Sequence, residues 1–221
     1  LNGDGVKEII HSMSGVPEIS AAWQINGAPF LFDNTSFELV ASLTPAIGDI
    51  SNLTPGEEMT YHRGGNSRTL WRSPNDPVTE TIPLSDLTIR LSSQPLIGVF
   101  LGSPVDIWGW SNGLIEWGEF ETGNRGVTNI GQGIQSLAVG NIDTDPDNEL
   151  IAVTDNGQVH LITGANQNQL IASLDPIIGS PAIGDLDQNG TDDIAVVTSN
   201  GQLYVLTAEG IAYQSDPVIG G

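Results

Sequence analysis

The chain of 221 residues has no cysteine and only six Lys or Arg residues, against 27 Asp or Glu. Without cysteine there are no disulfides and no thiol chemistry, so bound metal is the remaining means of cross-linking loops in a secreted protein. The formal charge of −21 would repel phosphate backbones, which argues against a nucleic-acid partner. No apolar run approaches the roughly 18–20 residues of a membrane span, so we expect no membrane insertion. Because the sequence begins with Leu1 rather than Met, we expect a processed or excised piece.

Helical periodicity is essentially absent, and in its place a short phrase recurs along the chain. Its five copies are residues 45–49, 95–99, 137–141, 181–185 and 217–221, each with glycine as the fourth residue. The glycines are 36 to 50 residues apart, a period that suits one four-stranded propeller blade per repeat. A β-sandwich also has short strands and Gly-rich turns, but it would not produce this self-similarity.

The sequence therefore predicts an all-β fold, a β-propeller of about five four-stranded antiparallel blades. We expect one domain over residues 1–221 with blades at about 1–44, 45–94, 95–135, 136–180 and 181–216. Residues 217–221 would form a first strand, either of the N-terminal blade or of a following one. The first alternative closes a five-blade ring, and the second makes the chain a fragment of a larger propeller.

The last two complete repeats show the expected blade plan. Residues 149–157 and 193–201 are near copies, each an apolar, β-branched run that ends at Asn-Gly. Asn-Gly between such runs is a strong signal for a tight hairpin turn. Residues 158–163 and 202–207 then alternate with period two, as strands do.

Acidic residues alternate in the loop that precedes the run at 193. Oxygen side chains stand at positions 1, 3, 5 and 9 of residues 185–193, and glycine stands at position 6. Calcium takes six to eight oxygen ligands, and the backbone carbonyl of position 7 can add one where the glycine allows a sharp turn. The candidate ligands are Asp185, Asp187, Asn189, Thr191 and Asp193. The alternative is a solvated Asx-turn without a metal.

The same spacing occurs twice more. Residues 141–149 supply Asn141, Asp143, Asp145, Asp147 and Glu149, although Pro146 replaces the glycine. An incomplete copy at the N-terminus supplies Asn2, Asp4, Val6 and Glu8. We therefore expect two Ca²⁺ sites and consider the N-terminal copy as a third.

These residues carry a family resemblance. Residues 184–197, Gly-Asp-Leu-Asp-Gln-Asn-Gly-Thr-Asp-Asp-Ile-Ala-Val-Val, resemble the FG-GAP/VCBS repeat of integrin-α-like and bacterial cell-surface propellers. The resemblance covers the last two blades well, the N-terminus partly, and residues 50–135 only through the recurring phrase. It implies calcium in the loops between first and second strands, a secreted or cell-surface setting, and adhesion or carbohydrate binding as frequent roles.

Two further groups are candidates for ligand binding. Residues 61–72 concentrate three arginines in the least repeat-like region, as Tyr61, His62, Arg63, Arg68 and Arg72. They could meet an anionic ligand such as a uronic acid, or form a surface insertion whose arginines pair with nearby acids. Trp108 and Trp110 share a strand face and could stack on a sugar ring, or pack between sheets instead.

Intact acidic loops repeat, whereas no catalytic constellation does. We therefore expect a non-enzymatic binding, adhesion or structural module stabilised by calcium. Its partner would be an extracellular glycan or protein, or other domains of a larger surface protein. The alternative is a lectin or a carbohydrate-active enzyme, such as a polysaccharide lyase, that uses residues 61–72.

Overall fold

The computed structural model describes two parts of the chain to different extents. Residues 91–119 and 122–217 are described throughout, and in residues 1–90 the strands 8–12, 20–24, 29–30, 46–48, 58–64, 67–71 and 77–81 are described. Every element in these residues is a β-strand. Accordingly, the described part of the chain offers no long apolar helix of the kind that crosses a membrane.

The chain divides into two compact units. The first unit comprises Leu1–Thr88 and Pro95–Ile97, and the second comprises Ile89–Gln94 and Gly98–Gly221. The first unit contains a three-stranded sheet of β1 (Glu8–Ser12), β2 (Ser20–Gln24) and β3 (Pro29–Phe30). Its other sheet has four strands, β4 (Ala46–Gly48), β5 (Glu58–Gly64), β6 (Ser67–Trp71) and β7 (Pro77–Thr81).

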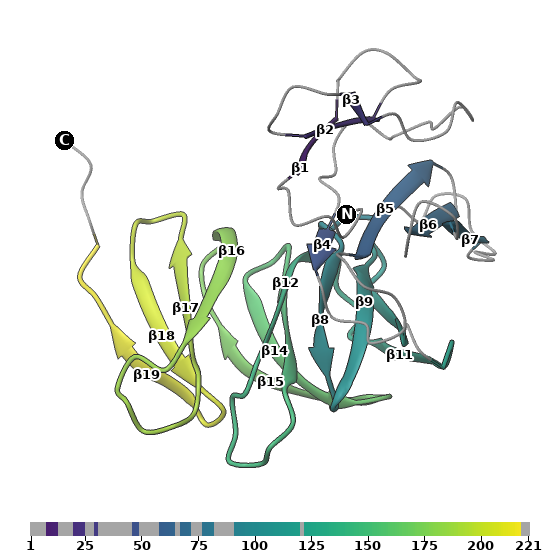
Figure 1. Ribbon diagram of the computed structural model, residues 1–221. Helices are drawn as coiled ribbons and strands as arrows, with labels where there is room; N and C mark the ends of the chain where they lie inside the picture. The colour runs from purple at the N-terminus through teal and green to yellow at the C-terminus, as the bar shows by residue number, and fades with distance from the viewer. Residues whose placement is uncertain are drawn as a thin grey trace. The chain divides into compact units, whose positions relative to one another are not determined.

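Three four-stranded antiparallel sheets follow along the chain (Figure 1). The first contains β8 (Leu96–Phe100), β9 (Ser103–Gly109), β10 (Leu114–Glu119) and β11 (Arg125–Asn129). The second contains β12 (Ile134–Gly140), β13 (Glu149–Thr154), β14 (Gln158–Gly164) and β15 (Gln167–Ser173). The third contains β16 (Ile177–Gly184), β17 (Asp193–Thr198), β18 (Leu203–Thr207) and β19 (Gly210–Gln214).

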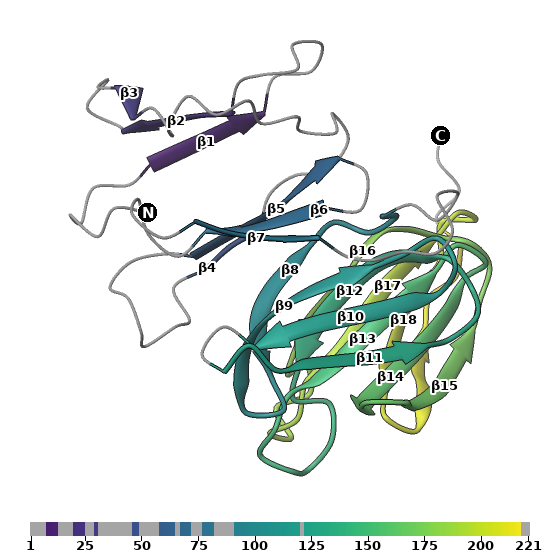
Figure 2. The same cartoon turned by 90° about the vertical axis from the view of Figure 1, so that its right-hand side faces the viewer.

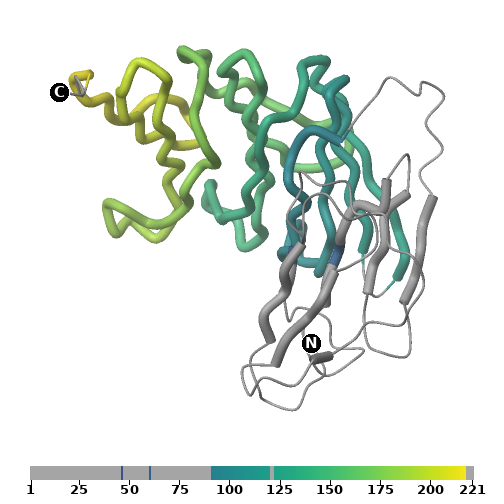
Figure 3. The backbone as a smooth tube through the Cα atoms, turned by 90° about the horizontal axis from the view of Figure 1, so that it is seen from above, coloured from purple at the N-terminus to yellow at the C-terminus, as the bar shows by residue number. Residues whose placement is uncertain are grey.

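Within each of these three sheets, strands that are consecutive in the chain lie side by side (Figure 2). This up-and-down order is the plan of a propeller blade. The sheets follow one another in chain order, from teal through green to yellow in Figure 3. The predicted all-β fold with four-stranded antiparallel blades is confirmed for these three sheets, and the expected total of five blades stays a prediction.

The last two sheets pack face to face through alternating apolar residues. Ile151 and Val153 on β13 belong to one buried cluster with Ile194 and Val196 on β17. Val159 and Leu161 on β14, together with Tyr204 and Leu206 on β18, complete its central part. Burying one such side chain contributes roughly 1.5–3 kcal/mol, so this contact is a principal source of stability for the two sheets.

The Asn-Gly hairpins adopt one repeated geometry. The amide of Gly157 donates to the carbonyl of Thr154 at 3.1 Å, and Gly157 has φ = 82°. Gly201 repeats this contact at 2.9 Å from Thr198, with φ = 81°. A turn closed from i to i+3 and followed by a left-handed glycine is the three-residue hairpin with a glycine bulge. The hairpins expected after 149–157 and 193–201 are therefore present.

Candidate metal centres

The loop between β12 and β13 is organised by its own carboxylates. The Asp143 Oδ1 atom accepts the amide of Asp145 at 2.8 Å, and Asp145 Oδ1 accepts the amide of Asp147 at 2.9 Å. At the end of the loop Glu149 reaches back, and its Oε2 accepts the amides of Ile142 at 2.8 Å and Asp143 at 3.3 Å. Alternate acids therefore turn toward the inside of a tightly wound loop.

Glu149 is a buried acid among other acids. It is the first residue of β13, and 2% of its surface is exposed. Burial raises the pKa of its carboxyl group, and the negative charges of Asp143 and Asp145 raise it further, against the amide hydrogen bonds that lower it. A cation at this position would favour the charged carboxylate and so offset both causes of the raised pKa.

The loop between β16 and β17 has the same organisation. The amide of Asn189 donates to Asp185 Oδ1 and to Asp187 Oδ1, each at 3.0 Å. Asn189 Oδ1 in turn accepts the amide of Thr191 at 2.8 Å and its hydroxyl at 2.7 Å. Asp193, the first residue of β17 and 4% exposed, reaches back to accept the amide of Leu186 at 3.0 Å.

Left-handed backbone conformations allow this second loop to turn sharply. Gly190 has φ = 95°, as expected for the glycine at position 6, and Gln188 has φ = 62°. The amide of Gly190 donates to Asp185 Oδ2 at 3.0 Å. The first loop has no glycine at position 6, yet its carboxylates still converge, so Pro146 does not prevent the arrangement.

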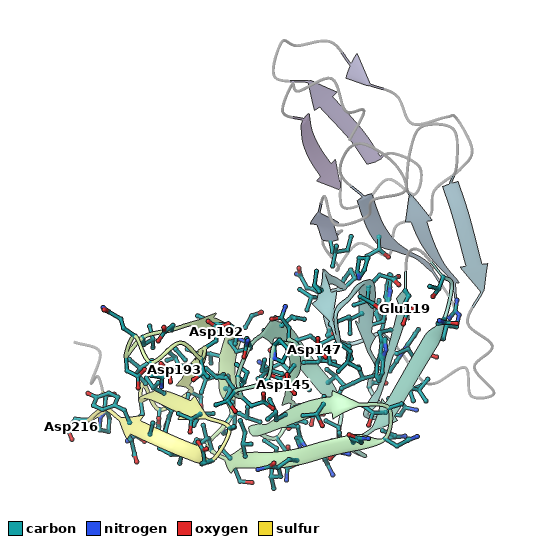
Figure 4. The ribbon with its side chains drawn as sticks, turned by 60° about the horizontal axis from the view of Figure 1, so that its bottom comes forward. Glu119, Asp145, Asp147, Asp192, Asp193 and Asp216 are labelled. Atoms are coloured by element: carbon teal, nitrogen blue, oxygen red, sulfur yellow. The ribbon has the colours of Figure 1, made fainter. Side chains whose placement is uncertain are left out.

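Each loop brings three carboxylates together. The triad of Asp143, Asp145 and Glu149 has one oxygen of each residue within 4.8 Å of the others, and so has the triad of Asp185, Asp187 and Asp193. Each triad can hold a metal ion. Figure 4 labels Asp145 and Asp147 in the loop of one sheet, and Asp192 and Asp193 where the loop of the next sheet ends.

Two observations favour a cation over a merely solvated acidic turn. Asn141 Oδ1 is a buried atom without a hydrogen-bond partner, although Asn141 Nδ2 donates to the carbonyl of Asp145 at 3.1 Å. An orphaned buried oxygen has lost its water without compensation, which costs about 1–3 kcal/mol. In addition, no Lys or Arg follows Arg125 in the sequence, so the sheets that carry the loops have no Lys or Arg side chain of their own to neutralise them.

The other ligands expected in these loops stay predictions. Asp147 lies outside the triad of its loop and contributes its amide to Asp145. Asn189 and Thr191 lie beside the second triad and are joined to each other by the hydrogen bonds given above. Positions 3 and 9 thus supply a carboxylate to both triads, while position 5 completes the first triad and position 1 completes the second.

The sequence did not predict a role for Asp192. Its Oδ2 accepts the amide of Asn141 at 3.0 Å, and its own amide donates to the carbonyl of Asn141 at 2.6 Å. This pair of hydrogen bonds joins the loop of one sheet to the loop of the preceding sheet. The only signal in the sequence was a second acid directly before Asp193.

Several sequence-based candidates fall where side chains are not described. Asn2, Asp4, Val6 and Arg72 lie outside the described residues, as does the segment 218–221. The backbones of Glu8, Tyr61, His62, Arg63 and Arg68 lie in β1, β5 and β6. The third calcium loop and the basic ligand site therefore stay predictions.

The two tryptophans are buried. Trp108 and Trp110 have 0% of their surface exposed, and their indole N–H groups donate to Asp106 at 2.8 Å and Glu116 at 2.9 Å. A sugar platform needs an exposed ring face, so the stacking role considered for Trp108 and Trp110 does not fit. The packing alternative is the one observed, and the acidic partners satisfy the ring nitrogens.

Comparison with known proteins identifies the fold but no family. No protein-family model matches the chain, and no curated protein matches its sequence. A chain in the crystal structure of BBS1N in complex with ARL6DN has a TM-score of 0.67 at 13% identity, over 96% of this chain and 65% of that one. The Vibrio cholerae biofilm matrix protein Bap1 has a TM-score of 0.65 at 15% identity, over 97% and 37%.

BamB from Moraxella catarrhalis is a third structure of this kind. It has a TM-score of 0.61 at 16% identity, over 98% of this chain and 62% of that one. The chain thus spans less than two thirds of the length of these structures. At such low identity the likeness concerns architecture alone, and together with the four-stranded sheets it identifies the chain as having a β-propeller-like fold.

Proposed function

We propose that this chain is a calcium-stabilised propeller module that binds or connects other extracellular molecules and has no catalytic activity of its own. The observation that carries the proposal is the convergence of three carboxylates in each acidic loop, with a buried, unpartnered Asn141 oxygen in the loop of the first triad. Calcium fits because every candidate ligand is a hard oxygen donor and the loops are short and acidic. Histidine and cysteine, which zinc prefers, are absent from both loops.

The residues that would hold the ion differ slightly between the loops. Asn141, Asp143, Asp145 and Glu149 would surround the first ion, and Asp185, Asp187 and Asp193 the second. In both loops the ninth residue is also the first residue of a strand, so a bound ion would tie the loop to the sheet. The ion would neutralise the carboxylates of the loop. It would also supply a cross-link, which this cysteine-free chain cannot obtain from disulfides.

The extracellular setting follows from the same chemistry. Extracellular calcium modules commonly have dissociation constants of about 10⁻⁴–10⁻³ M, which suits millimolar calcium outside cells. The resemblance of residues 184–197 to FG-GAP/VCBS repeats supports the same assignment and suggests adhesion or glycan binding. The binding or structural role is preferred because the acidic loops repeat along the chain, and the lyase alternative depends on residues 61–72, whose side chains are not described.

Thermal unfolding with and without calcium tests the proposal. Each site at tenfold saturation stabilises the folded state by roughly 1.4 kcal/mol, so two sites contribute about 3 kcal/mol. For a chain of this size we expect chelation to lower the Tm by about 5–10 °C. The variant Asp187→Asn should lose about half of this shift, and Asp175→Asn, which removes an acid outside both loops, should retain it. Identical melting curves in millimolar calcium and in chelator would refute the calcium assignment.

A further inference from the structure

Adjacent sheets exchange hydrogen bonds at a repeated position of the acidic loops. Asp192 is the eighth residue of the second loop, and it bonds Asn141, the first residue of the preceding loop, through both its side chain and its backbone. Asn148 is the eighth residue of the first loop. Its Nδ2 donates to the carbonyl of Val99 at 3.0 Å, and its carbonyl accepts the amide of Leu101 at 3.3 Å. The eighth residue thus connects each loop to the sheet before it.

The two connections differ in what they meet. Asn148 reaches the turn after β8, which carries no acidic triad among the described residues. Asp192 instead reaches Asn141, whose side-chain oxygen is the buried, unpartnered atom in the loop of the first triad. Asp192 is followed directly by Asp193, a member of the second triad. Asp192 therefore connects the two candidate metal centres. It is hydrogen-bonded to Asn141, a candidate ligand of the first centre, and it precedes Asp193 of the second centre in the chain.

We infer that Asp192 is a positioning residue for the first metal centre and that it couples calcium binding at the two loops. Resting on the proposed function, this inference adds communication between the sites. Calcium at the second loop fixes Asp193, and with it the backbone of Asp192. The Asp192 carboxylate then holds the amide of Asn141, so the Asn141 side chain is ordered before the first loop binds its ion. Because linkage is reciprocal, calcium at the first loop favours the second equally.

Repulsion between two divalent ions opposes the coupling through Asp192. Whether the coupling factor is above or below 1 therefore shows which of the two effects is stronger. Two independent sites would bind with a coupling factor of 1, and repulsion alone would make the factor smaller than 1. Ordering of Asn141 by Asp192 makes it larger than 1. We expect the combined affinity for two ions to exceed the product of the separate affinities by about fivefold, at the low end of typical coupling.

Calorimetric titration of the full chain with calcium chloride measures this factor. Glu149→Gln isolates the second site, Asp187→Asn isolates the first, and the parent chain gives both together. The cycle is repeated with Asp192→Asn and with Asp192→Ala. Both substitutions remove the same charge, but only the Asn side chain keeps an oxygen that can accept the Asn141 amide. The factor of about five should survive in Asp192→Asn and fall to 1 or below in Asp192→Ala.

A nuclear magnetic resonance measurement covers the case in which Asp192→Ala folds poorly. In the Glu149→Gln chain calcium loads only the second loop, and we expect the amide signal of Asn141 to shift on titration nonetheless. Two bound ions with a coupling factor of 1 in the parent, or equal factors in Asp192→Asn and Asp192→Ala, would overturn the inference and leave the proposed function standing. Absence of any calcium binding would overturn both.

Discussion

Ile183 on β16 fills the space that a side chain on Gly140 of β12 would need. A Cβ atom built on Gly140 would overlap Ile183 Cγ2 and lie 2.9 Å from Asp192 Oδ2. The equivalent contact between β8 and β12 is less close, because Val139 Cγ2 lies 3.6 Å from a Cβ built on Gly98. At Gly140 the close approach of the next sheet thus gives a physical reason for the glycine of the recurring phrase, whereas at Gly98 a Cβ would make only an ordinary contact.

This relationship predicts opposite outcomes for two equivalent glycines. Gly140→Ala should lower the free energy of unfolding by about 1–3 kcal/mol, because overpacking forces the neighbouring sheet to move. A Cβ on Gly184 meets nothing within 4 Å, so Gly184→Ala should change stability little or raise it by about 0.5 kcal/mol. Urea unfolding of both variants in calcium makes the comparison. Equal losses at the two positions would contradict the packing argument.

A second matched pair tests the contact between the last two sheets. Val153 and Val197 are the fifth residues of β13 and β17, but Val153 is 0% exposed and Val197 is 37% exposed. Val153→Ala removes two buried methyl groups and should cost about 2 kcal/mol. Val197→Ala should cost less than about 1 kcal/mol. Chemical denaturation at constant calcium measures both, and a larger loss for Val197→Ala would show that its face is covered in solution.

The sequence predicted the strands and hairpins of these sheets because local chemistry determines them. Alternating apolar residues, Asn-Gly turns and the glycine of the recurring phrase each act within a few residues. The convergence of Asp185, Asp187 and Asp193 was also accessible, since their spacing is local. The clustering of carboxylates in this loop could therefore be predicted before the fold was known.

The features that escaped prediction depend on contacts between sheets. Nothing in the run Asp192-Asp193 distinguishes a residue that faces its own loop from one that bonds the loop of another sheet. The burial of Trp108 and Trp110 likewise depends on how neighbouring sheets pack and on Asp106 and Glu116 as partners for the indoles. The hydrogen bond from the Asp147 amide to Asp145 Oδ1 also did not follow from the spacing, and the role of Asp147 as a ligand stays a prediction.

The substitution Glu149→Gln should change the Tm in opposite directions in the metal-free and the calcium-bound protein. Its folded pKa is raised above the ordinary 4.5, so the folded state binds the proton more tightly than the unfolded state does. The free energy of unfolding of the metal-free protein therefore falls as pH rises from 4.5 through the raised folded value. At pH 7 without calcium, Glu149→Gln should raise the Tm, because it removes a buried charge and keeps an acceptor for Ile142 and Asp143.

In saturating calcium the same substitution should lower the Tm below that of the parent, because the first site loses a charged ligand. Scanning calorimetry at pH 7 and at pH 4 separates the two effects. At pH 4 without calcium the advantage of Glu149→Gln should shrink, since the parent carboxyl is then protonated in the folded state. A Tm that is lower for the variant under all these conditions would mean that Glu149 is stabilised as a carboxylate without metal.

The last prediction compares two acids of one loop. Asp145 belongs to the first triad, whereas Asp147 does not, although the two residues are equally charged and two positions apart. Asp145→Asn replaces a carboxylate donor by a neutral one and should weaken calcium binding at this loop by about tenfold or more. Asp147→Asn keeps the amide that donates to Asp145 Oδ1 and removes only a nearby charge, so a loss below about threefold is expected. Calorimetric titration in the Asp187→Asn background reads the first site alone. If Asp147→Asn weakened binding as much as Asp145→Asn does, the ion would have to be held by all the alternating acids of the loop, and the triad would not define the site.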